Sequence, residues 1–243
     1  MLNELQRTTD AIRAERYTDA RVIFLAGSLV RGEGTSTSDL DLVVVFDRLP
    51  CAYRESFIYE TWPVEAFVHD PQTLEYFFRV VDRPTGVPSL ITMVSEGVEI
   101  PGASDFSDGL KRLAAAVLNE GPPKWSDNEL INSRYAIKDL IEDMKDPRSP
   151  QELHAIATLL YSALANHYFR SRSMWSAKGK AIPRKLHVAD SNFAEQFLSS
   201  FDSVFQNCST QKVIQLAAGM LEVDGGFLFQ DHKLEAPALW SIG

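Results

Sequence analysis

The stretch Leu25-Ala-Gly-Ser-Leu-Val-Arg-Gly-Glu-Gly-Thr-Ser-Thr-Ser-Asp-Leu-Asp-Leu-Val43 decides the fold of the first half of the chain. An apolar run of strand length ends at Gly27-Ser28, a segment rich in glycine, serine and threonine follows, and Asp39 and Asp41 begin the next apolar run. Side chains on a strand alternate between its two faces, so both aspartates are expected on one face and the neighbouring leucines on the other. The stretch therefore predicts two carboxylates side by side at the start of a strand.

Two neighbouring carboxylates repel each other unless a cation neutralises them, and oxygen ligands favour Mg²⁺ or Mn²⁺ over zinc. Gly27 lets the backbone approach a ligand closely, and Ser28, at an expected helix start, offers a hydroxyl and an N–H group to a phosphate. A bare Asp-x-Asp is usually only a turn and a solvated strand end. The Gly-Ser pair that begins twelve residues before Asp39 makes the pattern far more specific.

This combination resembles the signature of the DNA polymerase β-like nucleotidyltransferase superfamily, and the resemblance covers about residues 20–80. It implies transfer of a nucleoside monophosphate from an NTP, with ATP as the expected donor, and two Mg²⁺ (or Mn²⁺) ions held by three carboxylates. Glu65, inside the apolar stretch Trp62-Pro-Val-Glu-Ala-Phe-Val68, is the expected third carboxylate. The alternative for Glu65 is an ordinary solvent-facing strand residue.

The resemblance also implies roles for individual residues. Asp39, Asp41 and Glu65 are expected to be catalytic and to bind the metal ions. The residues expected to bind the nucleotide in the same half are Gly27, Ser28, Arg31 and Ser38.

The layout of the chain is similar to that of the antibiotic nucleotidyltransferases, the kanamycin nucleotidyltransferases in particular. This implies an enzyme of the EC 2.7.7 type whose acceptor is a hydroxyl of a small molecule, such as an aminoglycoside- or lincosamide-like compound. Two alternatives stay open: adenylylation of a protein or RNA partner, and a nucleotide-binding protein without catalysis. The fold alone does not identify an acceptor.

Periodicity predicts an α+β protein with two domains. Short apolar runs of strand length at 21–26, 40–46 and 64–68 predict a small mixed β-sheet backed by helices. We expect this nucleotidyltransferase domain to span residues 1–120. The pair Pro122-Pro123 interrupts any helix and marks the expected boundary.

The second half, residues 121–243, is predicted to be an all-α helical bundle that closes the active site. Ser126-x-x-Glu129 and Ser149-Pro-x-Glu152 are capping-box patterns, and each is expected to open a long helix. A later apolar stripe at helical spacing ends before Gly225-Gly226. Several amphipathic helices must bury their stripes against one another, which predicts the bundle.

Two groups of charges in the second half are candidate site residues. Residues 170–185 carry six cations and no acidic residue, and we expect Lys180 or Arg184 to contact the triphosphate. The alternatives are a solvated loop and an RNA contact. Asp139 and Glu142 lie three positions apart on a predicted helix and are candidates for the general base; the alternative is that they belong to the solvated face that a long helix normally carries.

Composition excludes several other classes of protein. The chain has 243 residues, 45% hydrophobic and 23% charged, which is ordinary for a folded globular protein. The net charge of −9 disfavours a general nucleic-acid binder. Two cysteines are too few for a disulfide framework, and no apolar run approaches membrane-spanning length. We expect a cytoplasmic protein without a membrane partner, and a homodimer stays open.

Overall fold

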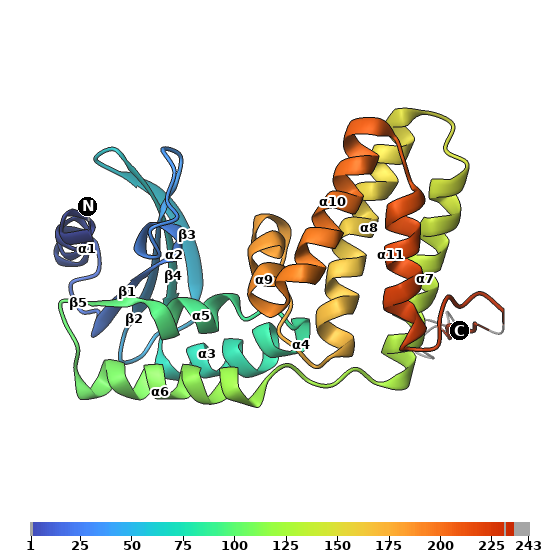
Figure 1. Ribbon diagram of the computed structural model, residues 1–243. Helices are drawn as coiled ribbons and strands as arrows, with labels where there is room; N and C mark the ends of the chain where they lie inside the picture. The colour runs from blue at the N-terminus through green and yellow to red at the C-terminus, as the bar shows by residue number, and fades with distance from the viewer. Residues whose placement is uncertain (1, 231, 236–243) are drawn as a thin grey trace, which may run out of the picture. The chain divides into compact units, whose positions relative to one another are not determined.

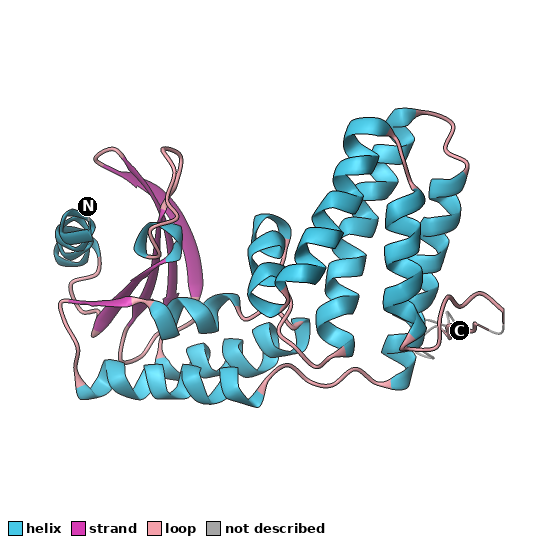
Figure 2. Cartoon of the chain, viewed as in Figure 1, coloured by secondary structure: helices cyan, strands magenta, loops and turns pink. Residues whose placement is uncertain are grey.

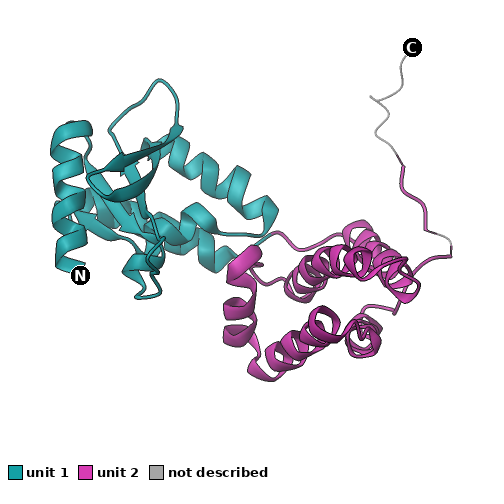
Figure 3. Cartoon of the chain, turned by 90° about the horizontal axis from the view of Figure 1, so that it is seen from above, with its two compact units in different colours: residues 1–122 teal, residues 123–243 magenta. Residues whose placement is uncertain are grey.

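The computed structural model describes residues 2–230 and 232–235 of the chain. Its backbone contacts divide the chain into two compact units, Met1–Pro122 and Pro123–Gly243 (Figure 3). The first contains all the strands of the described residues, and the second is helical (Figure 2). The predicted α+β class, a mixed sheet with helices followed by a helical region, is confirmed.

The first unit is built on a five-stranded sheet with the order β3-β4-β2-β1-β5. The strands β2 and β4 are parallel, and every other neighbouring pair is antiparallel. The strands are β1 (Val22–Ala26), β2 (Leu40–Val45), β3 (Tyr53–Tyr59), β4 (Trp62–His69) and β5 (Val98–Ile100).

Helices cover both faces of this sheet (Figure 1). Helix α1 (Leu2–Arg16) contacts β1 and β5, and its buried Leu5 and Ile12 share a core with Leu40 and Leu42 of β2. On the other face α5 (Ser89–Glu96) contacts β1 and β2, and α3 (Pro71–Tyr76) contacts β4. The short α2 (Gly27–Val30) lies between β1 and β2. The helical elements that follow β4 are α3 (Pro71–Tyr76), the π-helical turn η1 (Phe77–Asp82), α4 (Arg83–Thr85), α5 (Ser89–Glu96) and α6 (Asp105–Glu120).

The second unit packs its long helices around one apolar core. The predicted capping residues Ser126 and Ser149 accept hydrogen bonds from the backbone N–H groups of Glu129 and Glu152 and begin α7 and α8. Buried residues such as Phe197 join the helices into a single cluster. The helices are α7 (Asp127–Lys145), α8 (Pro150–Ser171), η2 (Gly179–Ala181), α9 (Ile182–Ala189), α10 (Ser191–Asn207) and α11 (Gln211–Glu222).

Membrane-spanning helices are absent from the part of the chain that the structure describes, since none of its helices combines the necessary length and apolarity.

Candidate functional site

The site begins where β1 ends and the chain turns sharply into α2. Gly27 has φ +79°, a left-handed conformation that disfavours residues with a side chain. A Cβ atom on Gly27 would collide with the carboxylate of Asp41. Glycine is therefore required here for two reasons, the backbone angle and the close approach of a carboxylate to the backbone.

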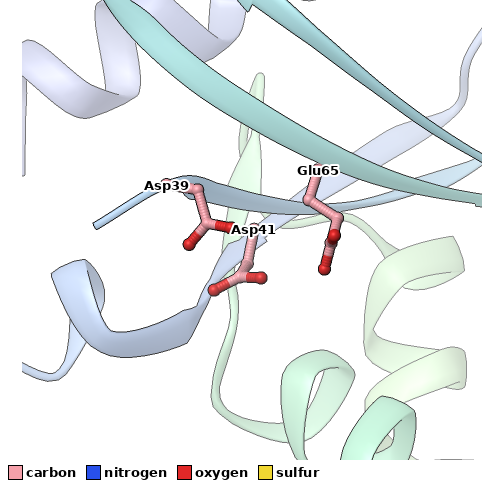
Figure 4. Close-up of side chains that lie close together, drawn as sticks. All are labelled: Asp39, Asp41 and Glu65. Carbon is pink, nitrogen blue, oxygen red and sulfur yellow. The ribbon is translucent and has the colours of Figure 1, made fainter. Parts of the chain in front are cut away.

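Strand register brings the three predicted carboxylates together. Asp41 on β2 lies directly opposite Glu65 on the parallel strand β4, so both side chains project from the same face of the sheet. Asp39 lies two residues before Asp41 and shares this face, while Leu40 and Leu42 point into the core beneath α1. Figure 4 shows the three carboxylate groups side by side. One carboxylate oxygen from each residue can be chosen so that all three atoms lie within 4.8 Å of one another.

These residues fit a divalent cation. The donor set is three half-buried carboxylates, the oxygen ligands that Mg²⁺ and Mn²⁺ prefer. Ligand atoms on an octahedral Mg²⁺ lie about 3.0 Å apart when adjacent and about 4.2 Å apart when opposite, so the three oxygens would move closer together to share one ion. Because Gly27 has no side chain, the Asp41 carboxylate occupies the space that a Cβ atom would fill.

Hydroxyl groups organise the loop between α2 and β2. The Ser28 hydroxyl donates to Oγ of Ser38 at 3.2 Å, and the backbone N–H of Thr35 donates to the same oxygen at 2.9 Å. Ser28 and Ser38 are thus held together by the loop itself, and Ser38 directly precedes Asp39 in the sequence. Arg31 instead pairs with Glu33 at 3.2 Å and with Glu96 at 3.5 Å, so its predicted contact with a nucleotide would require it to leave these partners.

Arg54 is a neighbour of the site that the sequence reasoning did not identify. It lies on β3 and donates a hydrogen bond to Oε1 of Glu65. β3 was not among the predicted strands, so the sequence did not indicate that Arg54 lies close to Glu65. Knowledge of the β3–β4 register would have revealed it.

The other predicted site residues all belong to the second unit. Asp139 and Glu142 are exposed on α7, where Glu142 pairs with Lys145 at 2.7 Å and with Lys138 at 3.0 Å. The hydrogen bonds from Lys145 and then Lys138 lower the pKa of Glu142. Lys180 lies in η2 and Arg184 on α9, and both side chains are exposed. Their assignments to the site stay predictions.

The basic window at 170–185 is less uniform than its sequence implies. Arg170 is buried and donates to the carbonyl oxygen of Pro123 at 2.8 Å. Arg172 donates to the carbonyl oxygen of Tyr168 at 3.0 Å and lies over the ring of that tyrosine. These two arginines therefore stabilise the helical unit.

Comparisons with known proteins agree with this geometry. Residues 9–70 match the family model described as a nucleotidyltransferase domain, a range that includes Gly27, Ser28 and the three carboxylates. Over these residues the first unit is similar to the nucleotidyltransferase domain family.

The chain resembles a crystal structure of a nucleotidyltransferase-like protein from Exiguobacterium sibiricum at 15% identity, over 90% of this chain and 73% of that chain, with a TM-score of 0.42. Such a distant match does not bear on activity. No curated protein matches the chain.

Proposed function

We propose that the protein is a divalent-metal-dependent nucleotidyltransferase that transfers a nucleoside monophosphate, AMP from ATP, to a hydroxyl of a small molecule such as an aminoglycoside- or lincosamide-like compound. The observation that carries the proposal is the convergence of Asp39, Asp41 and Glu65 within 4.8 Å, with Gly27 directly against Asp41. Three like charges at this separation are costly without a cation, and they lie inside the matched region.

The residues of the first unit would divide the work as follows. Asp39 and Asp41 would hold the ions that accompany the triphosphate, and Glu65 would complete the ligand set at the reacting centre. When bound, such ions neutralise phosphate charge and lower the pKa of an attacking hydroxyl. The Ser28 hydroxyl and the N–H groups at the start of α2 would bind phosphate oxygens.

The transfer itself is a displacement at the α-phosphorus. The acceptor oxygen forms a new P–O bond, the bond to the bridging oxygen breaks, and pyrophosphate leaves with that electron pair. The acceptor proton would pass to a carboxylate, for which Asp139 and Glu142 of α7 are the proposed bases. Because Glu142 is already paired with Lys138 and Lys145, we expect Asp139→Asn to reduce kcat more than Glu142→Gln.

Lys180 and Arg184 are proposed to contact the triphosphate. A triphosphate with one divalent ion keeps excess negative charge, which an exposed cation can neutralise. Lys180→Ala and Arg184→Ala should each raise KM for ATP by about three- to tenfold and leave metal binding unchanged. Lys212→Ala, an exposed lysine on α11, is the matched control. Unchanged KM values in both variants would remove this segment from the site.

The test of the proposed function is transfer from α-³²P-labelled ATP, GTP, CTP and UTP with Mg²⁺, in the presence of aminoglycosides, lincosamides or cell extract. We expect label on a small molecule with stoichiometric pyrophosphate release, and no label with Asp41→Asn. Label in the protein or RNA fraction would instead favour a macromolecular acceptor. Pyrophosphate release by the wild type that Asp41→Asn leaves unchanged would contradict the proposal.

A further inference from the structure

Arg54 occupies a fixed place beside the carboxylate cluster. In the antiparallel pair β3–β4, Ser56 lies opposite Glu65 and Arg54 lies opposite Phe67, so Arg54 and Glu65 are diagonal neighbours on one face. The Arg54 guanidinium lies 5.0 Å from the centre of the Phe67 ring and donates to Oε1 of Glu65. The ring and the carboxylate together hold the cation at the edge of the cluster.

Another cation can replace the Arg54 guanidinium as the partner of Glu65. The Arg54 side chain is 58% exposed, so its ion pair with Glu65 is solvated and weak. Glu65 is only 22% exposed and lies within reach of both aspartates. A divalent cation shared by three carboxylates interacts with Glu65 more strongly than one solvated guanidinium does.

We propose that Arg54 is a built-in counter-ion of Glu65, which a divalent cation must displace before Glu65 can join its ligand set. Arg54 neutralises part of the repulsion between the three carboxylates when no ion is bound, and it lowers the affinity of the cluster for metal. Binding of metal to the three carboxylates then depends on the nucleotide, which brings divalent ions and the negative charge of its phosphates. This inference rests on the proposed function, because it takes the carboxylates as a metal site.

The sign of the effect separates this role from a structural one. Removing a positive charge beside a cation site strengthens cation binding, whereas loss of a structural contact would weaken it. In a titration of the full chain with Mn²⁺ alone, followed by the EPR signal of the free ion, Arg54→Gln should bind about three- to tenfold more tightly than the wild type. Arg54→Lys, which keeps the charge, should stay nearer the wild type.

The chain offers a close control for Arg54. Arg21 is 49% exposed, pairs with Asp47 at 2.7 Å, and lies 4.8 Å from the centre of the Phe106 ring. It makes the same two kinds of interaction as Arg54, an ion pair with a carboxylate and a cation–π contact, but with other partners. Arg21→Gln should leave Mn²⁺ affinity unchanged.

A double-mutant cycle assigns the effect to the proposed partner. If Arg54 acts through Glu65, the gain from Arg54→Gln should shrink when Glu65 is already replaced by Gln. A thermal melt of each variant confirms that it is folded. An undiminished gain in the Glu65→Gln background would overturn the assignment to Glu65.

The outcomes for the inference and the proposed function are distinct. Equal or weaker Mn²⁺ binding by Arg54→Gln, with binding abolished by Asp41→Asn, would overturn the counter-ion role and leave the metal site standing. Failure of both the wild type and Arg54→Gln to bind Mn²⁺ would overturn the metal site and the inference together.

Discussion

Polar side chains have different roles in the two units of the molecule. In the helical unit, the buried His167 is 2.9 Å from Oγ of Ser133 and 2.9 Å from Oδ2 of Asp224, and these contacts tie α7 and α8 to the end of α11. Arg134 likewise donates to backbone carbonyls of Gly225 and Gly226. In the sheet unit, three side chains of the same charge converge instead.

The contrast shows how a structural network differs from a ligand site. In the helical unit, donors meet acceptors. The carboxylate of Asp224 accepts from Nε2–H of His167, which leaves Nδ1 to accept from the Ser133 hydroxyl. The carboxylates of the cluster are acceptors that repel one another, and the Arg54 guanidinium that donates to Glu65 neutralises only part of their charge, so the cluster would stabilise a bound cation.

The largest effect should come from removing a charge from the carboxylate cluster. Asp39→Asn and Asp41→Asn should each lower nucleotide transfer by about 10²-fold or more, because each would remove a proposed metal ligand, while the fold is retained. Transfer is measured by pyrophosphate release and folding by thermal melting. Asp47→Asn, an exposed aspartate of the same unit, should stay near wild type.

The contrast would break down if both aspartate variants kept near-native turnover. The convergence of Asp39, Asp41 and Glu65 would then be an accident of strand register.

The close approach of Asp41 to the backbone can be tested at Gly27. Gly27→Ala places a Cβ in a left-handed conformation, which costs about 1–2 kcal/mol, and makes it collide with the Asp41 carboxylate. Gly32→Ala is a matched control, because Gly32 has φ +73° with open space around it. Both variants should be destabilised, but only Gly27→Ala should also lose Mn²⁺ affinity. Similar Mn²⁺ affinity in the two variants would show that the contact with Asp41 does not shape the site.

The network of the helical unit should matter for stability and not for metal binding. His167→Ala leaves the Ser133 hydroxyl and the Asp224 carboxylate without their partner and should lower the free energy of unfolding by about 2–4 kcal/mol. His187→Ala, an exposed histidine on α9, should change it by less than about 0.5 kcal/mol. Urea denaturation measures both. Loss of Mn²⁺ binding in a folded His167→Ala variant would contradict the division between the units.

A further effect is a slope of the free energy of unfolding with pH. Burial lowers the pKa of His69 in the sheet unit to about 4. The unfolded chain takes up this proton near pH 6.5, so between these values the unfolded state binds more protons. The contribution of the neutral His69 to the free energy of unfolding is fully present above pH 6.5. It falls as pH decreases toward 4, by up to about 1.4 kcal/mol per pH unit.

A variant isolates the contribution of His69. Unfolding by urea at several pH values should show a shallower slope for His69→Gln than for the wild type. Burial also lowers the pKa of His167, but its contact with Asp224 partly offsets this, so His167→Gln should change the slope less. Identical slopes for wild type and His69→Gln would contradict the account of a neutral, buried His69.

Local sequence predicted the elements that carry strong signals. The capping patterns at Ser126 and Ser149 begin α7 and α8 as expected, because a cap depends on residues only three positions apart. The face shared by Asp39 and Asp41 follows in the same way from strand alternation.

Features that depend on distant pairing were not predictable. β3 (Tyr53–Tyr59) is half exposed and carries Arg54 and Glu55, so it lacks the apolar run that marked the other strands. β5 has three residues and owes its existence to pairing with β1. The contact of Arg54 with Glu65 depends on the β3–β4 register, which no local pattern contains.

The central claim is that Asp39, Asp41 and Glu65 hold divalent cations for nucleotide transfer. The most direct measurement is anomalous diffraction at the manganese edge, from crystals grown with Mn²⁺ and a non-hydrolysable ATP analogue. We expect manganese at about 2.0–2.3 Å from carboxylate oxygens of these residues, with the triphosphate beside Ser28. An ordered analogue whose manganese lies away from all three carboxylates would contradict it.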